Sequence, residues 1–121
     1  MSFVPWNTYL LYCTYIKPEP KNKFAICVPA DNKDLFFYIN SNPRTIFNPL
    51  TQVKITTVEF PFLKYNSYIN AADIINCVVG PTCKVEKEFG PIPIQVVTKI
   101  KEAVENSETL PYRFVQNILT G

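Results

Sequence analysis

The sequence predicts a mostly β protein with helices at its C-terminal end, folded as a small barrel or a strongly curled antiparallel sheet. Two observations favour this fold class. Eleven prolines against three glycines indicate many short extended segments that are broken by turns. Hydrophobic residues make up 47% of the 121 residues, which is enough for one packed core. We therefore expect a single domain over residues 1–121.

Short runs rich in β-branched and aromatic residues predict the strands. These runs cover residues 8–16, 24–28, 35–39, 53–58, 72–79 and 82–85. The last two runs are expected to pair around Gly80-Pro81. Between the early strands lie a lysine-containing loop over residues 17–23, a turn over 30–34 and a polar loop over 40–44.

The character of the chain changes after Gly90-Pro91. Apolar residues now recur at the spacing of a helix that buries one face. They are Val96, Val97, Ile100, Ala103 and Val104. A second short helix is predicted over residues 112–119, which gives the sheet two helices at its C-terminal end.

The absence of histidine restricts the chemistry of the chain. It removes the usual general base at neutral pH and the commonest zinc ligand. Any catalysis must use Lys, Arg, Tyr, Asp, Glu, Ser, Thr or a positioned water. No glycine-rich phosphate loop, calcium loop or dinucleotide fingerprint is present, so we expect no cofactor and no metal. The net charge of +2 is too small to indicate nucleic-acid binding by itself.

Four cysteines stand at Cys13, Cys27, Cys77 and Cys83, without a C-x-x-C pair and at poor spacings for zinc. The first residues do not show a basic region followed by an apolar run, so a signal peptide is not expected. We therefore expect a cytoplasmic protein with free buried thiols rather than disulfides. No apolar stretch approaches the length that spans a membrane.

Two polar segments early in the chain are candidate phosphate sites. Lys21 and Lys23 make one segment locally basic, although lysines are also ordinary in solvated loops. Ser41 and Arg44 lie after a strand, where Ser41 can hydrogen-bond a phosphate and Arg44 can hold one with two donors. The alternative for this segment is ordinary turn chemistry, since Asn, Ser and Pro favour turns.

A third segment, residues 61–70, is dense in hydrogen-bonding side chains. Tyr65 and Tyr68 can stack on bases, while Lys64 and Ser67 can contact a nucleic-acid backbone. The same tyrosines can equally form a wall of the core with satisfied hydroxyls. The sequence leaves these two interpretations open.

The order of three segments resembles the PemK/MazF toxin-like proteins, in particular the short PemK-like proteins of prophages and mobile DNA. The segments are Lys23-Phe24-Ala25-Ile26-Cys27-Val28, residues 35–41, and Pro61-Phe62-Leu63-Lys64-Tyr65-Asn66-Ser67-Tyr68-Ile69. The chain departs from the family where Lys23 stands for Arg, Phe24 for Pro, and Ser41 for the usual Thr. The resemblance covers residues 21–119.

The resemblance implies an SH3-like barrel and a metal-independent endoribonuclease of single-stranded RNA. It places catalysis on Lys23 and Ser41. The residues for RNA binding or an interface are then Lys21, Arg44, Lys64, Tyr65, Ser67 and Tyr68. The alternative is a non-catalytic interaction module that binds RNA, an antitoxin-like protein or a host factor. Pairing into a homodimer is expected under the first interpretation.

Overall fold

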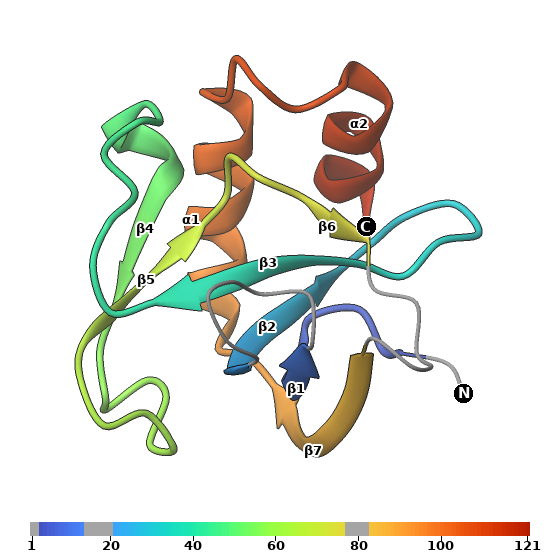
Figure 1. The fold of residues 1–121 in the computed structure, drawn as a ribbon. Helices are drawn as coiled ribbons and strands as arrows, with labels where there is room; N and C mark the ends of the chain where they lie inside the picture. Colours follow the sequence, from blue (N-terminus) through green and yellow to red (C-terminus); the bar gives the residue numbers. More distant parts are fainter. Residues whose placement is uncertain (1–2, 14–20, 77–82) are drawn as a thin grey trace.

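The computed structural model describes residues 3–13, 21–76 and 83–121, and it shows a curled antiparallel sheet with two C-terminal helices (Figure 1). The sheet has seven strands in the order β4-β5-β3-β2-β1-β7, and β6 pairs with β3 beside this path. Because β4 and β7 end the path without pairing to each other, the sheet is open. The predicted class is confirmed, and of its two forms the curled sheet is the observed one.

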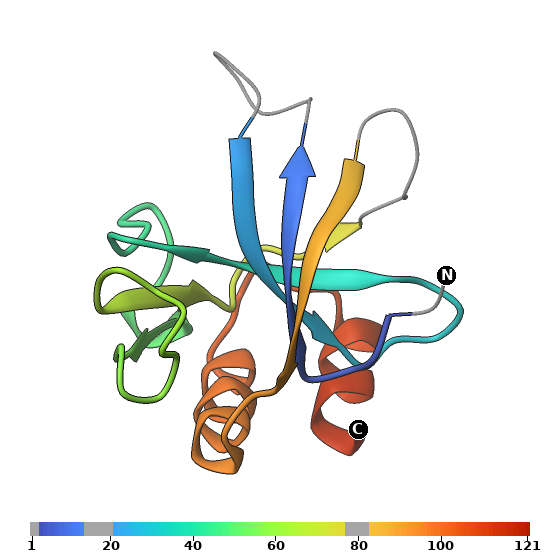
Figure 2. The same cartoon turned by 90° about the horizontal axis from the view of Figure 1, so that it is seen from below.

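The first three strands form an antiparallel meander at the centre of the sheet. They are β1 (Asn7–Cys13), β2 (Lys21–Val28) and β3 (Leu35–Asn40). The last strand, β7 (Cys83–Pro91), lies against β1, and the register between them shifts twice. Figure 2 shows β2, β1 and β7 side by side, extending away from the helices. This three-stranded part therefore presents surface that the helices do not cover.

The remaining strands are short. They are β4 (Gln52–Ile55), β5 (Ser67–Asn70) and β6 (Ile75–Asn76). A short 3-10 helix, η1 (Pro49–Thr51), directly precedes β4. β4 is shorter than predicted because it ends at Ile55 and the chain turns over residues 57–59. The predicted hairpin around Gly80-Pro81 is wrong for its described part, since β6 pairs with β3 while β7 pairs with β1. The rest of that prediction, residues 77–82, lies outside the described residues.

Alternation along the strands builds two cores on the two faces of the sheet. The large core lies under the helices, and its bulkiest members are Phe37, Phe60, Ile26, Ile69 and Ile100. The small core lies on the other face of β1, β2 and β3. It consists of Phe3, Tyr9, Leu11, Ala25, Cys27, Phe36 and Cys83.

Both predicted helices are present. Helix α1 (Ile94–Glu105) buries Val96, Ile100, Ala103 and Val104 in the large core, which is the predicted apolar face. Helix α2 (Tyr112–Thr120) buries Ile118 in the same core. Each helix starts directly after a proline, which cannot donate the hydrogen bond that an interior position requires. Among the described residues, no helix is long and apolar enough to cross a membrane.

The prediction of free thiols is half right. Cys27 is a free, buried cysteine of the small core. Cys83 is disulfide-bonded, which corrects the expectation, and its partner's side chain lies outside the described part of the chain. The expectation of free thiols rested on the predicted compartment, and sequence spacing alone does not decide whether a thiol is oxidised.

Candidate functional site

A cavity of about 240 Å³ opens where the end of β3 meets the segment between β4 and β5. We call it the Ser41 pocket. Phe24, Ile39, Phe62, Leu63 and Ser67 line it together with Ser41, Lys64 and Tyr65. Four of the eight predicted site residues, namely Ser41, Lys64, Tyr65 and Ser67, thus lie together although they are up to 26 positions apart.

The floor of the pocket is apolar and its rim is polar. Ile39 and Leu63 are buried, and the rings of Phe24 and Phe62 are half-buried. Ser41 and Lys64 are exposed at the rim, and Tyr65 keeps 67% of its surface exposed. An apolar cavity with a few polar groups at its mouth is the usual form of a small-molecule binding site.

Hydrogen bonds hold the segment over residues 56–66, which carries one side of the pocket. The Glu59 carboxylate accepts from the backbone N–H and the hydroxyl of Thr56, at 3.0 and 3.2 Å. The Thr57 N–H donates to the Asn66 amide oxygen at 3.1 Å. The ring of Phe60 is buried in the large core and anchors the same segment. Lys64 and Tyr65 are therefore presented on a fixed support.

The Ser67 hydroxyl helps to fix the position of Tyr65. It donates to the Tyr65 carbonyl oxygen at 2.9 Å, and its residue is only 6% exposed. The only hydroxyl proton of Ser67 is therefore engaged by the backbone, and Ser67 could act toward a ligand only as a hydrogen-bond acceptor. Tyr65 and Ser41 are the hydroxyls that remain at the rim.

An aromatic cluster borders the Ser41 pocket. The rings of Phe62 and Phe89 stack with centroids 3.9 Å apart and planes 15° apart. Phe24 packs against both of them, at 5.2 Å from Phe62 and 5.8 Å from Phe89. The ammonium of Lys87 lies 5.2 Å from the centroid of Phe89. The pocket thus continues into aromatic and basic surface on β7.

Lys23 does not line the Ser41 pocket. It lies within β2 rather than at a loop junction, so its side chain alternates with that of Phe24 and points to the opposite face of the sheet. There the Lys23 ammonium donates to the Asn40 side-chain oxygen at 2.6 Å and lies 5.4 Å from the centroid of Tyr38. The structure therefore places the Lys23 ammonium at Asn40, outside the lining of the Ser41 pocket.

Two further predicted residues, Tyr68 and Arg44, also lie apart from the pocket. Tyr68 alternates with the pocket residue Ser67 along β5 and pairs with Asn40 across the sheet, on the same face as Lys23. Arg44 is exposed in the next loop, where its backbone N–H donates to the Gln52 side-chain oxygen at 3.0 Å. Lys21 begins β2, and its side chain lies outside the described part of the chain.

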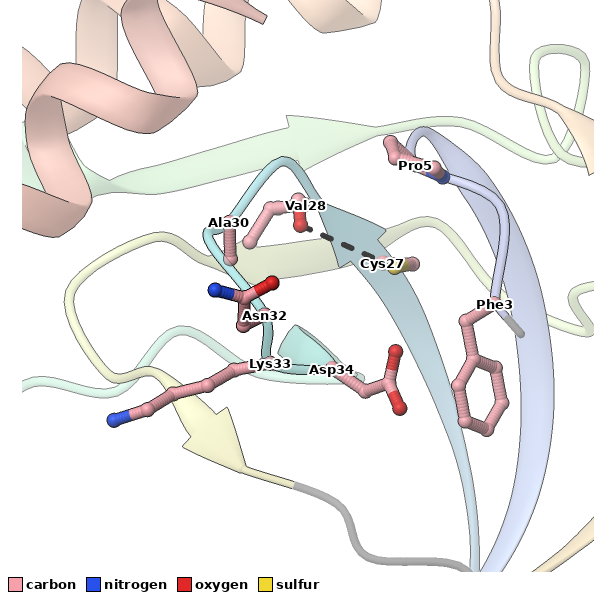
Figure 3. A pocket seen from close by; sticks show the side chains of 8 residues that line it. All are labelled: Phe3, Pro5, Cys27, Val28, Ala30, Asn32, Lys33 and Asp34. Carbon is pink, nitrogen blue, oxygen red and sulfur yellow. Dashed lines mark hydrogen bonds between the residues drawn. The ribbon is translucent and has the colours of Figure 1, made fainter. Parts of the chain in front are cut away.

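A second cavity, of about 250 Å³, lies near the C-terminal end of β2, between the N-terminal segment and the turn after the strand. We call it the Cys27 pocket; Phe3, Asn32 and Asp34 line it along with Cys27 (Figure 3). Burial, with a smaller effect of the nearby Asp34 charge, raises the pKa of the Cys27 thiol to about 12. Cys27 therefore stays protonated at neutral pH and is a poor nucleophile.

The remaining lining of the Cys27 pocket belongs to the turn. Asn32 has a φ of 54°, which asparagine tolerates better than most residues, so the turn explains its presence. Figure 3 shows Lys33 pointing away from the cavity. We take the Ser41 pocket as the candidate site because four of the predicted site residues line it.

Comparison with known proteins does not identify a family or a function for the chain. No protein-family model matches the chain, and no curated protein is significantly similar to it in sequence. The resemblance to the PemK/MazF proteins therefore stays a prediction.

Sequence reasoning missed three contributors to this region: Phe24, Phe89 and Lys87. Phe24 was treated as a departure from a motif, although its alternation with Lys23 would have placed it on the same face as the core residue Ile26. Phe89 and Lys87 lie in a charged segment, and their partner Phe62 is 27 positions away from Phe89. No local pattern indicates a contact of that separation.

Proposed function

We propose that the protein binds single-stranded RNA and that the Ser41 pocket receives one base. The observation that supports this most directly is the convergence of an apolar, aromatic slot with Ser41, Lys64 and Tyr65 at its mouth. Aromatic rings and apolar walls accept the flat face of any base, while lysine and hydroxyl groups contact the phosphate and the ribose.

Binding is better supported than cleavage by the predicted catalytic pair. Catalysis by Lys23 and Ser41 requires both side chains at one phosphate. Lys23 does not line the pocket that holds Ser41, and its ammonium donates to the Asn40 side-chain oxygen. The non-catalytic alternative therefore fits the geometry more closely, and ribonuclease activity remains a prediction for the test below.

The compartment is part of the proposal. RNA binding agrees with the predicted cytoplasmic localisation. The disulfide at Cys83 argues against it, because structural disulfides are typical of oxidising compartments. Acid quenching of intact cells, followed by thiol blocking under denaturing conditions and mass spectrometry, decides between the two, because Cys83 is buried in the native protein. Blocked Cys83 indicates a reducing compartment, and Cys83 that is blocked only after reduction indicates an oxidising one.

The test is binding of a labelled single-stranded RNA, with a chelator present so that metal-dependent contaminants are silent. Tyr65→Ala should weaken binding by at least about fivefold, since stacking on one base contributes about 1–3 kcal/mol. Ser41→Ala should weaken it less. The matched control is Tyr112→Ala, because Tyr112 is similarly exposed, at 77%, but lies on α2.

Equal affinity of the Tyr65→Ala and Tyr112→Ala proteins would contradict the proposal. The same reactions report cleavage. RNA cut by the wild type, and left intact by both Lys23→Ala and Ser41→Ala, would establish the ribonuclease and overturn the purely binding function.

A further inference from the structure

A stack of side chains leads from the Ser41 pocket to a lysine on β7. Phe62 lines the pocket and stacks on Phe89, so one face of the Phe89 ring is covered. The ammonium of Lys87 lies over the same ring, 5.2 Å from its centroid. The two separations, 3.9 and 5.2 Å, place the Lys87 ammonium within about 9 Å of the Phe62 ring centre.

The position of Lys87 suits an anionic ligand. Lys87 is exposed and pairs with Leu10 across the sheet, on the face that carries Phe24 and Phe89. Within residues 3–13, 21–76 and 83–121, no carboxylate forms an ion pair with it. Its neighbour Glu88 is engaged by Tyr9, whose hydroxyl donates to the Glu88 carboxylate at 2.7 Å. The Lys87 charge is therefore not neutralised.

The ring of Phe89 limits where that charge can move. An exposed lysine normally samples many rotamers, and holding it at a ligand costs entropy. Attraction between the ammonium and the ring face contributes about 0.5–1 kcal/mol at an exposed site, which favours one position of the lysine. The ammonium is thereby held at a distance from the pocket that one nucleotide of an extended strand can span.

We propose that Lys87 binds the phosphate next to the base held in the Ser41 pocket, and that Phe89 is its positioning residue. This inference rests on the proposed RNA binding and specifies the ligand further. The ligand is a strand of at least two nucleotides, not a free nucleoside. Because an ammonium is a point charge, Lys87 contributes affinity without reading the base.

The test compares two five-nucleotide RNAs of the same sequence, one with phosphodiester linkages and one with neutral methylphosphonate linkages. Lys87→Gln should weaken binding of the phosphodiester strand several-fold. It should also lower the slope of log affinity against log salt by about 0.7, the value for one phosphate contact on a single strand. Binding of the neutral strand should be the same for Lys87→Gln and wild type.

The matched control is Lys33→Gln, which removes an equal charge from a lysine that also lies over a ring, 5.8 Å from the centroid of Phe114. Phe89→Leu keeps an apolar side chain but removes the ring face. It should weaken binding of the phosphodiester strand less than Lys87→Gln does. Its binding of the neutral strand should equal that of the wild type.

The two proposals fail in different ways. If Lys87→Gln and Lys33→Gln bind the phosphodiester strand equally while Tyr65→Ala still weakens binding, the Lys87 proposal is overturned and the RNA site stands. If the wild type binds neither strand, both proposals are overturned. Equal losses on both strands would show that Lys87 acts through the fold rather than through a phosphate.

Discussion

The Ser41 pocket and the Cys27 pocket differ in whether their most reactive side chains are open to solvent. In the Ser41 pocket the rim groups are exposed, and Tyr65 keeps 67% of its surface open. In the Cys27 pocket the reactive type of residue is present, yet its thiol is buried and its pKa is raised. A cavity of similar volume thus indicates a site only where its side chains can still exchange protons or hydrogen bonds with a ligand.

The largest expected effect is on the free energy of unfolding, and it compares a residue of the small core with a residue of the Ser41 pocket. Phe36 is fully buried in the small core and meets Phe3 and Tyr9 edge-to-face, with ring centroids 4.9 and 6.2 Å away. Phe36→Ala should lower the free energy of unfolding by about 3–5 kcal/mol. Half-buried Phe62, replaced by Ala, should lower it less and weaken RNA binding instead. Urea unfolding and RNA titration of both variants measure the two effects, and a reversed order would break the contrast.

The next effect concerns pH and the small core. Burial, together with the Glu88 carboxylate, raises the pKa of Tyr9 to about 12 from its ordinary 10. Above pH 10 the unfolded chain releases this proton more readily than the folded protein. The free energy of unfolding should therefore fall by up to about 2–3 kcal/mol from pH 10 to pH 12.

Comparison with Tyr9→Phe isolates the share of Tyr9 in that alkaline loss, since Cys27 titrates in the same direction with a pKa of about 12. Unfolding by urea at several alkaline pH values measures the slope for both proteins. Identical slopes for wild type and Tyr9→Phe would show that Tyr9 keeps its ordinary pKa.

A smaller effect is expected at Lys23, the predicted catalytic residue. Lys23→Ala removes the hydrogen bond to Asn40, which should lower the free energy of unfolding by about 1 kcal/mol. RNA affinity should stay close to that of the wild type, because Lys23 faces away from the Ser41 pocket. Denaturant unfolding and RNA titration check this. A loss of RNA affinity as large as that of Tyr65→Ala would instead show that Lys23 takes part in RNA binding.

The smallest effect is expected at Cys27. Cys27→Ala should leave RNA affinity unchanged, since the residue is buried on the small-core face and its thiol stays protonated. In the wild type, iodoacetamide at neutral pH should modify Cys27 only after denaturation, as mass spectrometry of the modified protein would show. Rapid modification of the native protein would mean that the Cys27 pocket is chemically accessible.

The sequence predicted the fold class and helices well because both follow from local patterns. Val96, Ile100 and Val104 recur at helical spacing, and all three are buried as expected. The structure brings the predicted residues Ser41 and Tyr65 into one pocket and leaves Lys23 outside its lining. The sequence did not predict this difference because β2 begins at Lys21, and alternation then fixes the face of each following side chain of the strand.

The stack of Phe62 on Phe89 marks the limit of prediction from one sequence. Each residue alone resembles an ordinary half-buried aromatic, and their meeting depends on β7 lying beside β1 rather than beside the strand before it. Strand order in a sheet is set by packing over the whole chain, so a local pattern does not contain it.

The register shift between β1 and β7 at Leu10 and Leu11 decides which face of the sheet carries the lysines of β7. Leu10 and Leu11 are consecutive, but their partners are Lys87 and Val85, so Glu86 is an extra residue on β7. This single insertion resets the alternation and brings Lys84 and Lys87 to one face although they are three positions apart. Deleting Glu86 would therefore shift the strand by one residue. Every side chain of β7 on one side of the deletion would then point to the opposite face of the sheet. The length of one strand, as much as the identity of its residues, decides which surface of this protein is basic.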